Sequence, residues 1–145
     1  GCRTLGSESV HDWNVIMRRC HADDTNNVLW LKMRPDTPQH YEYVRVEDFT
    51  GKCRNGLLVR PWTQFFQKEE REDMPLSQCN DITFRNIRMD CGVFFNVTGS
   101  DKYALKQFTF EDIDSRDAGK EKPFATRPVE GLTLKNVVLN GEQIF

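Results

Sequence analysis

The chain has 145 residues, enough for one domain with a modest hydrophobic core. Its formal net charge is −2, and its basic residues are spread along the sequence, which argues against nucleic-acid binding. No apolar run approaches the roughly 20 residues that a membrane-spanning helix needs. The opening residues Gly1 to Thr4 show no signal-peptide pattern, and we expect that the true start of the protein is missing from this chain. We therefore expect a single domain over residues 1–145 that neither spans a membrane nor binds nucleic acid.

One alternating pattern recurs five times along the chain. The segments cover residues 15–20, 44–49, 82–87, 108–113 and 132–137. Alternation with a period of two is typical of strands that bury one face. In each segment a polar residue precedes the last apolar one, and short polar side chains at this place favour a bend because they can bond their own backbone. These residues are Arg19, Asp48, Asn86, Asp112 and Asn136.

A second set of apolar segments lies between the first, at residues 28–33, 57–60 and 93–97. The five segments of the first set start 29, 38, 26 and 24 residues apart, which suits one solenoid turn per interval with loops of varying length. Helix-period patterns are almost absent. We predict an all-β fold, a right-handed single-stranded parallel β-helix of about five coils, with loop insertions at 67–71 and 114–128.

An antiparallel β-sandwich is the alternative architecture, because short strands at regular spacing fit it as well. The repeated unit keeps the same internal phase, and signals for tight hairpins between the strands are scarce. Both observations favour the β-helix.

Three short motifs occur in order along the chain. Leu-Gly-Ser-Glu stands at 5–8, Asn-Val-Ile-Met-Arg-Arg-Cys at 14–20 and Trp-Leu-Lys at 30–32. They resemble the I-G-S that follows the G-H-G motif, the N-V-x-V-x-N-C coil and the R-I-K of the polygalacturonase-like glycoside hydrolases, family twenty-eight. The interval of 12 residues from Cys20 to Lys32 is also similar to the corresponding interval in that family's R-I-K coil. The resemblance covers almost the whole chain and implies a right-handed parallel β-helix that acts on pectin.

The family's chemistry requires two carboxylates, one to protonate the leaving oxygen and one to activate water. The family takes them from N-T-D and D-D motifs upstream of I-G-S, and neither motif has a counterpart before Leu5. Aligning the chain to the D-D coil instead places Asn26 and Asn27 on the two acids, and an amide cannot exchange a proton as a carboxyl does. We therefore predict no catalytic residue in this chain.

The resemblance implies the C-terminal part of a glycosidase that hydrolyses galacturonate- or rhamnose-containing pectin outside the cytoplasm, in the periplasm or after secretion. The alternative is a non-catalytic module that binds carbohydrate or serves as structure. A β-helix without its N-terminal coils exposes the end of its stack. We therefore also expect self-association, or pairing with the missing N-terminal part.

Three residues are predicted to bind substrate. The resemblance places Lys32 on the lysine that holds a substrate carboxylate, whereas Trp30 stands where the family has arginine. An indole could stack on a sugar ring or fill space against the core. Arg60 follows Lys32 in the coil register and could clamp a uronate carboxylate through two hydrogen bonds.

We predict neither a metal site nor a cofactor. His21, Asp23 and Asp24 fall close together, but adjacent acids on a strand point to opposite faces, so a turn explains them better. His11 and His40 are expected on the surface. The five cysteines fit no metal-binding spacing, and one disulfide is possible without an indication of which pair forms it.

Overall fold

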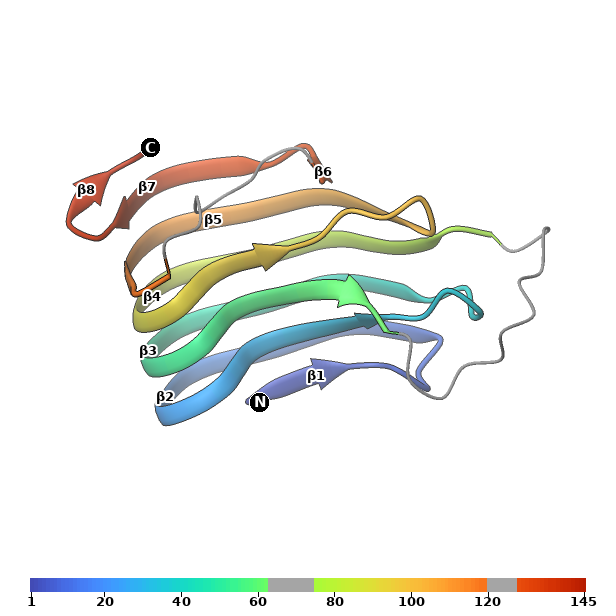
Figure 1. Ribbon diagram of the computed structural model, residues 1–145, viewed down its shortest axis with the longest axis horizontal. Helices are drawn as coiled ribbons and strands as arrows, with labels where there is room; N and C mark the ends of the chain where they lie inside the picture. The colour runs from blue at the N-terminus through green and yellow to red at the C-terminus, as the bar shows by residue number, and fades with distance from the viewer. Residues whose placement is uncertain (63–74, 120–127) are drawn as a thin grey trace.

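The chain folds as a stack of parallel strands in the computed structural model, which describes residues 1–62, 75–119 and 128–145 (Figure 1). These residues form no helix, and so contain none long and apolar enough to cross a membrane. The strands are β1 (Arg3–Leu5), β2 (His11–Met33), β3 (His40–Pro61), β4 (Ser77–Val97), β5 (Tyr103–Asp117), β6 (Val129–Glu130), β7 (Thr133–Leu139) and β8 (Glu142–Gln143).

Neighbouring strands run in the same direction. β1 to β5 pair in sequence order, β5 then pairs with β6 and β7, and all of these pairs are parallel. Among the described strands, only the short β8 runs antiparallel, against β7. The predicted parallel β-helix is confirmed, and the antiparallel sandwich is wrong. The solenoid has about four turns rather than five, because five stacked segments enclose four complete intervals.

The alternating segments build the core as straight rows of side chains. Val46, Phe84 and Phe110 are aligned in register across β3, β4 and β5, and none of the three is more than 1% exposed. Met17, the corresponding residue of β2, is only partly buried because none of the described coils covers it from the other side. Burying such apolar rows contributes about 25 cal/mol per Å² removed from water.

The long strands bend where the sequence predicted it. The five polar residues of the repeat all adopt a left-handed backbone, with φ between 51° and 55°. Asparagine and aspartate tolerate this region better than other side chains. Asn86 Nδ2 donates to Asp48 Oδ1 at 2.7 Å, and Asn136 Nδ2 donates to Asp112 Oδ1 at 2.7 Å. Two pairs of neighbouring bends are therefore hydrogen-bonded through their side chains.

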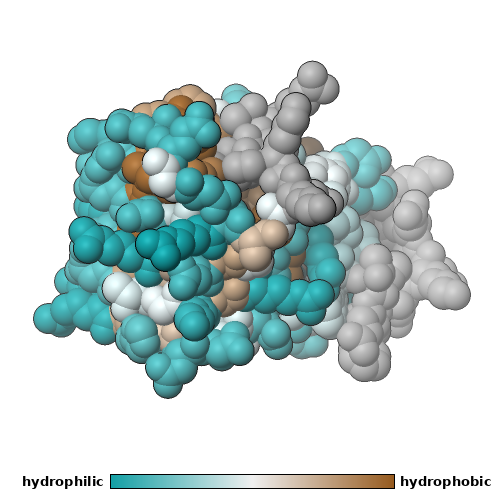
Figure 2. Space-filling model, turned by 60° about the vertical axis from the view of Figure 1, so that its left-hand side comes forward, coloured by the Kyte–Doolittle hydropathy of each residue, from teal (hydrophilic) through white to brown (hydrophobic). Residues whose placement is uncertain are grey.

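A row of alternating charges runs along the outside of the same strands. Arg18, Glu47, Arg85, Glu111 and Lys135 occupy register-paired positions and form successive ion pairs at 3.2, 4.0, 3.2 and 3.0 Å. Hydrogen bonds from Lys135 and Arg85 hold the pKa of Glu111 below its ordinary value. Figure 2 shows a largely hydrophilic surface, with hydrophobic atoms at its upper end, where β7 and β8 lie in Figure 1.

Two local predictions are wrong. Residues 114–117, predicted to begin a loop, continue β5 because each pairs with β4 from Arg88 to Cys91. His21 to Asp24 lie within β2, where the register shifts between Ala22 and Thr25, so a bulge replaces the predicted turn. The predicted insertion at 67–71 lies outside the described residues.

Candidate functional site

The three residues predicted to bind substrate lie together on the outer face of the solenoid. Trp30 and Lys32 are two residues apart on β2 and therefore share a face. Lys32 pairs in register with Arg60 of β3. The backbone nitrogen of Trp62 donates to the Met33 carbonyl at 2.7 Å, which adds a second indole beside them. We call Trp30, Lys32, Arg60 and Trp62 the tryptophan–cation surface.

Cations and rings are interleaved on this surface. Lys32 Nζ lies 4.6 Å from the ring centroid of Trp30 and 4.0 Å from that of Trp62. The Arg60 guanidinium carbon lies 5.4 Å from the Trp30 centroid. The two indoles meet edge to face with centroids 5.3 Å apart. Such cation–π contacts contribute about 0.5–1 kcal/mol each at exposed sites and orient both partners.

The cations of this surface remain available to an anion. Arg60 is exposed, whereas Lys32, Trp30 and Trp62 are half-buried. Within residues 1–62, 75–119 and 128–145, no carboxylate forms an ion pair with Lys32 or Arg60. The Trp30 Nε1 atom is buried and has no hydrogen-bond partner among the described atoms. A bound carboxylate could therefore meet both cations without displacing one of these acids.

Buried contacts hold the backbone beneath the surface. The Tyr41 hydroxyl donates to the Lys32 carbonyl at 3.1 Å, and Tyr41 itself is fully buried. Burial raises the pKa of this phenol, so it remains a donor. A Cβ atom on Gly6, whose φ is +88°, would collide with the Tyr41 hydroxyl, which explains a glycine at this place. The end of β2 is thus packed tightly against the turn after β1.

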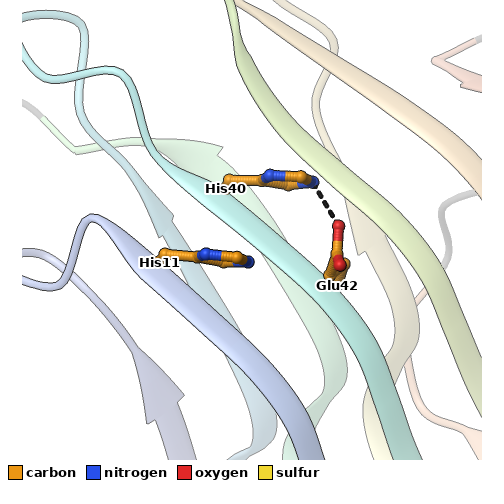
Figure 3. Close-up of side chains that lie close together, drawn as sticks. All are labelled: His11, His40 and Glu42. Carbon is orange, nitrogen blue, oxygen red and sulfur yellow. Dashed lines mark ion pairs between the residues drawn. The ribbon is translucent and has the colours of Figure 1, made fainter.

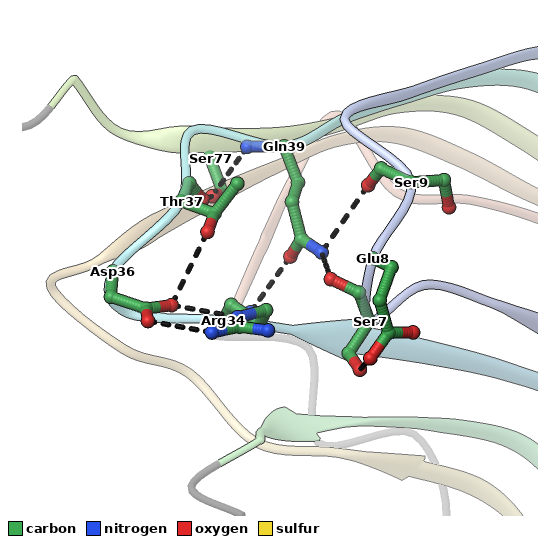
Figure 4. A network of polar contacts seen from close by, with 8 residues as sticks. All are labelled: Ser7, Glu8, Ser9, Arg34, Asp36, Thr37, Gln39 and Ser77. Carbon is green, nitrogen blue, oxygen red and sulfur yellow. Dashed lines mark hydrogen bonds and ion pairs between the residues drawn. The ribbon is translucent and has the colours of Figure 1, made fainter. Parts of the chain in front are cut away.

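A polar network fixes the turn that follows Lys32 (Figure 4). Gln39 is 1% exposed and donates through Nε2 to the Ser7 carbonyl at 2.8 Å, while its Oε1 accepts from the Arg34 backbone nitrogen at 2.7 Å. Arg34 also makes two bonds to the Asp36 carboxylate, at 2.7 and 2.6 Å. These bonds raise the pKa of Arg34 and lower that of Asp36. The network joins three consecutive coils, since the Ser77 hydroxyl accepts from the Gln39 backbone nitrogen at 3.0 Å.

Asn27, one of the two amides that could be aligned with catalytic acids, is part of a side-chain ladder. Asn55 Nδ2 donates to Asn27 Oδ1 at 2.9 Å, and Asn96 Nδ2 donates to Asn55 Oδ1 at 2.9 Å. Asn27 is 5% exposed. Its amide is therefore committed to holding successive coils together.

The structure also brings together residues that the sequence analysis kept apart. His11 and His40 begin β2 and β3 and stack on each other, with Glu42 beside them. The signal was available: the two histidines are 29 residues apart, the same interval as between the first two repeats. Both are near the surface as predicted, His11 exposed and the His40 side chain 39% exposed.

Among the cysteines, the structure singles out one pair. Cys53 and Cys91 are register partners, and their sulfur atoms lie 3.0 Å apart. The hydrogen bond between the two thiols, together with burial, raises the pKa of Cys53. Cys79 is buried against the Met33 sulfur at 3.4 Å, and Cys2 is exposed. If one disulfide forms within this chain, the geometry favours Cys53 with Cys91.

Comparisons with protein-family models, with curated proteins and with solved structures give no match to this chain. The residues and the fold therefore carry the functional argument.

Proposed function

We propose that the chain handles an acidic, pectin-like polysaccharide and binds galacturonate-containing sugar at the tryptophan–cation surface. The observation that carries this proposal is the gathering of two cations and two indoles on one face. An arginine can hold a uronate carboxylate through two hydrogen bonds, and an indole offers an apolar face to a sugar ring. A neutral glycan would pack against the indole rings but would offer no negative charge to the two cations.

The proposal assigns each residue a role. Lys32 and Arg60 bind the carboxylate of one uronate unit, because their side chains leave neighbouring strands at paired positions. Trp30 and Trp62 pack against the sugar on either side of Lys32 Nζ, which lies within 4.6 Å of both ring centroids. The resemblance to polygalacturonase-like hydrolases supports the same ligand and an extracytoplasmic location, in the periplasm or after secretion.

Titration with galacturonate oligomers tests the proposal. We expect binding by the chain, and Lys32→Ala or Arg60→Ala should weaken it about tenfold or more, because each removes a charge-assisted hydrogen bond worth roughly 1.5–3 kcal/mol. Lys106→Ala is the matched control, since this lysine pairs with Glu130 at 3.8 Å instead. Equal affinities in all variants, or equal affinity for neutral galactose oligomers, would contradict the proposal.

The same titrations separate binding from catalysis. We propose that residues 1–145 do not cleave polygalacturonate, because the sequence has no counterpart of the family's N-T-D and D-D motifs before Leu5. A clean preparation should release no reducing sugar. Release that depends on the protein would overturn this part of the proposal. Absence of any galacturonate binding would favour the alternative, a structural module.

The open edge of β2 supports the proposed self-association. β1 pairs only with Leu29–Leu31, so the first half of β2 has no neighbour on that side among the described residues. Trp13 is 67% exposed there and Ile16 49%, and a cavity of about 790 Å³ opens beside them. Unpaired strand edges of this kind join with other strands. At the other end of the stack β8 pairs with the edge of β7.

We expect sedimentation to show association that increases with protein concentration. Ile16→Lys should shift the chain towards monomer, because a charge on an edge strand disfavours edge-to-edge pairing. Phe145→Lys is the control at the opposite end, where the side chain is exposed to a similar extent, 54% against 49% for Ile16. A wild-type chain that remains monomeric at all concentrations would show that a second copy does not cover this edge.

A further inference from the structure

His11, His40 and Glu42 form a cluster at the start of β2 and β3 (Figure 3). His11 and His40 are register partners, and their rings stack with centroids 4.8 Å apart and planes within 5° of parallel. Glu42 follows His40 by two residues on the same face of β3. His40 Nε2 and Glu42 Oε2 are 2.6 Å apart.

These three side chains offer a suitable ligand set for a transition metal. Each contributes one ligand atom, and the three atoms lie within 4.8 Å of one another. Zinc binds histidine nitrogen at about 2.0–2.1 Å and carboxylate oxygen at about 2.0–2.2 Å, and open sites combine three protein ligands with water. Two ligands at i and i+2 of one strand and a third on the next strand can thus converge on one ion.

The surroundings allow an ion to enter. The side chains of His40 and Glu42 are 39% and 30% exposed, and His11 is exposed. His40 Nε2 and Glu42 Oε2, which already contact each other, are the two atoms that would bind the ion from β3. Because the rings are parallel, the nitrogens of His11 and His40 do not yet point at one centre, and the exposed His11 ring must turn to complete the site.

We infer that His11, His40 and Glu42 bind a divalent transition-metal ion, with zinc as the best match. Zinc replaces the proton between His40 and Glu42, and His11 supplies the third ligand from the adjacent coil. The ion would therefore link β2 to β3 at the exposed end of the stack. This site is separate from the tryptophan–cation surface, since it shares no residue with it.

Zinc titration by calorimetry tests the inference. We expect one zinc ion per chain, with affinity at least tenfold lower in His11→Ala and in Glu42→Gln, and no binding of magnesium. His21→Ala is the matched control: His21 is also exposed, but it bonds Thr50 Oγ1 at 2.7 Å and lies 3.3 Å from Asp23. Unchanged zinc affinity in His11→Ala and Glu42→Gln would overturn the inference, as would its loss in His21→Ala.

Cobalt absorption identifies the ligands independently. Cobalt bound to two histidines, a carboxylate and water gives weak visible bands without a thiolate-to-cobalt charge-transfer band. Such a charge-transfer band would place the metal on a cysteine such as Cys2 or Cys20 and overturn the assignment. Circular dichroism of each variant verifies that the strands remain folded, which is expected because His11 is exposed.

Discussion

Replacing Phe84 by alanine is expected to lower the free energy of unfolding by about 3–5 kcal/mol. Phe84 is completely buried in a middle coil. Its ring stacks on Phe110 at 5.3 Å and meets the edge of Phe94 at 5.8 Å. Alanine would remove these contacts and leave a cavity, and the rigid stack of strands above and below cannot collapse to fill it.

Urea unfolding followed by circular dichroism measures this loss. Phe145→Ala is the matched control, because the same substitution at a side chain that is 54% exposed should change stability by no more than about 0.5 kcal/mol. If Phe84→Ala lowers the free energy of unfolding by less than about 1 kcal/mol, the rings of Phe84, Phe94 and Phe110 are not the core of the solenoid.

Linking Cys53 to Cys91 by a disulfide is expected to raise the free energy of unfolding by about 4 kcal/mol. The two residues are 38 apart in sequence, and the bond would close that length of the unfolded chain into a loop. In the folded chain the sulfurs already lie 3.0 Å apart on adjacent coils, so little rearrangement is needed. The bond would pin β3 to β4.

Oxidation is best carried out on the unfolded chain before refolding. In the folded state the hydrogen bond between the two thiols and burial raise the pKa of Cys53 and leave little reactive thiolate. Two thiols then give two electrons and two protons to oxidised glutathione, which leaves as two reduced molecules.

Urea unfolding compares the oxidised and reduced chains, and non-reducing peptide mapping identifies the bond. A Cys20→Ser chain should gain as much stability on oxidation as the unchanged protein, whereas a Cys53→Ser chain should gain none. Lower stability of the linked chain would contradict the expected gain.

The candidate site was partly visible in the sequence. Lys32 and Arg60 could be placed together because 28 residues separate them, close to the first repeat interval of 29. The stacked histidines obey the same interval, but no apolar pattern drew attention to them, and their pairing was recognised from the register of the strands. Trp62 joined Lys32 and Arg60 only in the structure, where its ring lies under the Lys32 ammonium.

The alternating pattern determined the strands, and its constant internal phase indicated the parallel stack and its bends. Period-two burial requires a strand, and a polar residue at one constant place requires the same bend in every coil, as Asn86 and Asn136 show. A second row of bends carried this signal only in part. Its members Asn14, Tyr43, Asp81 and Gln107 take φ of 58°, 53°, 62° and 56°, although tyrosine and glutamine do not favour it.

For most other residues, only the tertiary structure decided which side chains meet across coils. Asp117 continues a strand because Cys91 offers it a partner, and Cys91 in turn stands beside Cys53 because the coils are stacked in that register. Local preferences act over a few residues, whereas these contacts join positions more than 20 apart. Their geometry depends on the length of every intervening turn, and the pattern of apolar residues does not specify that length.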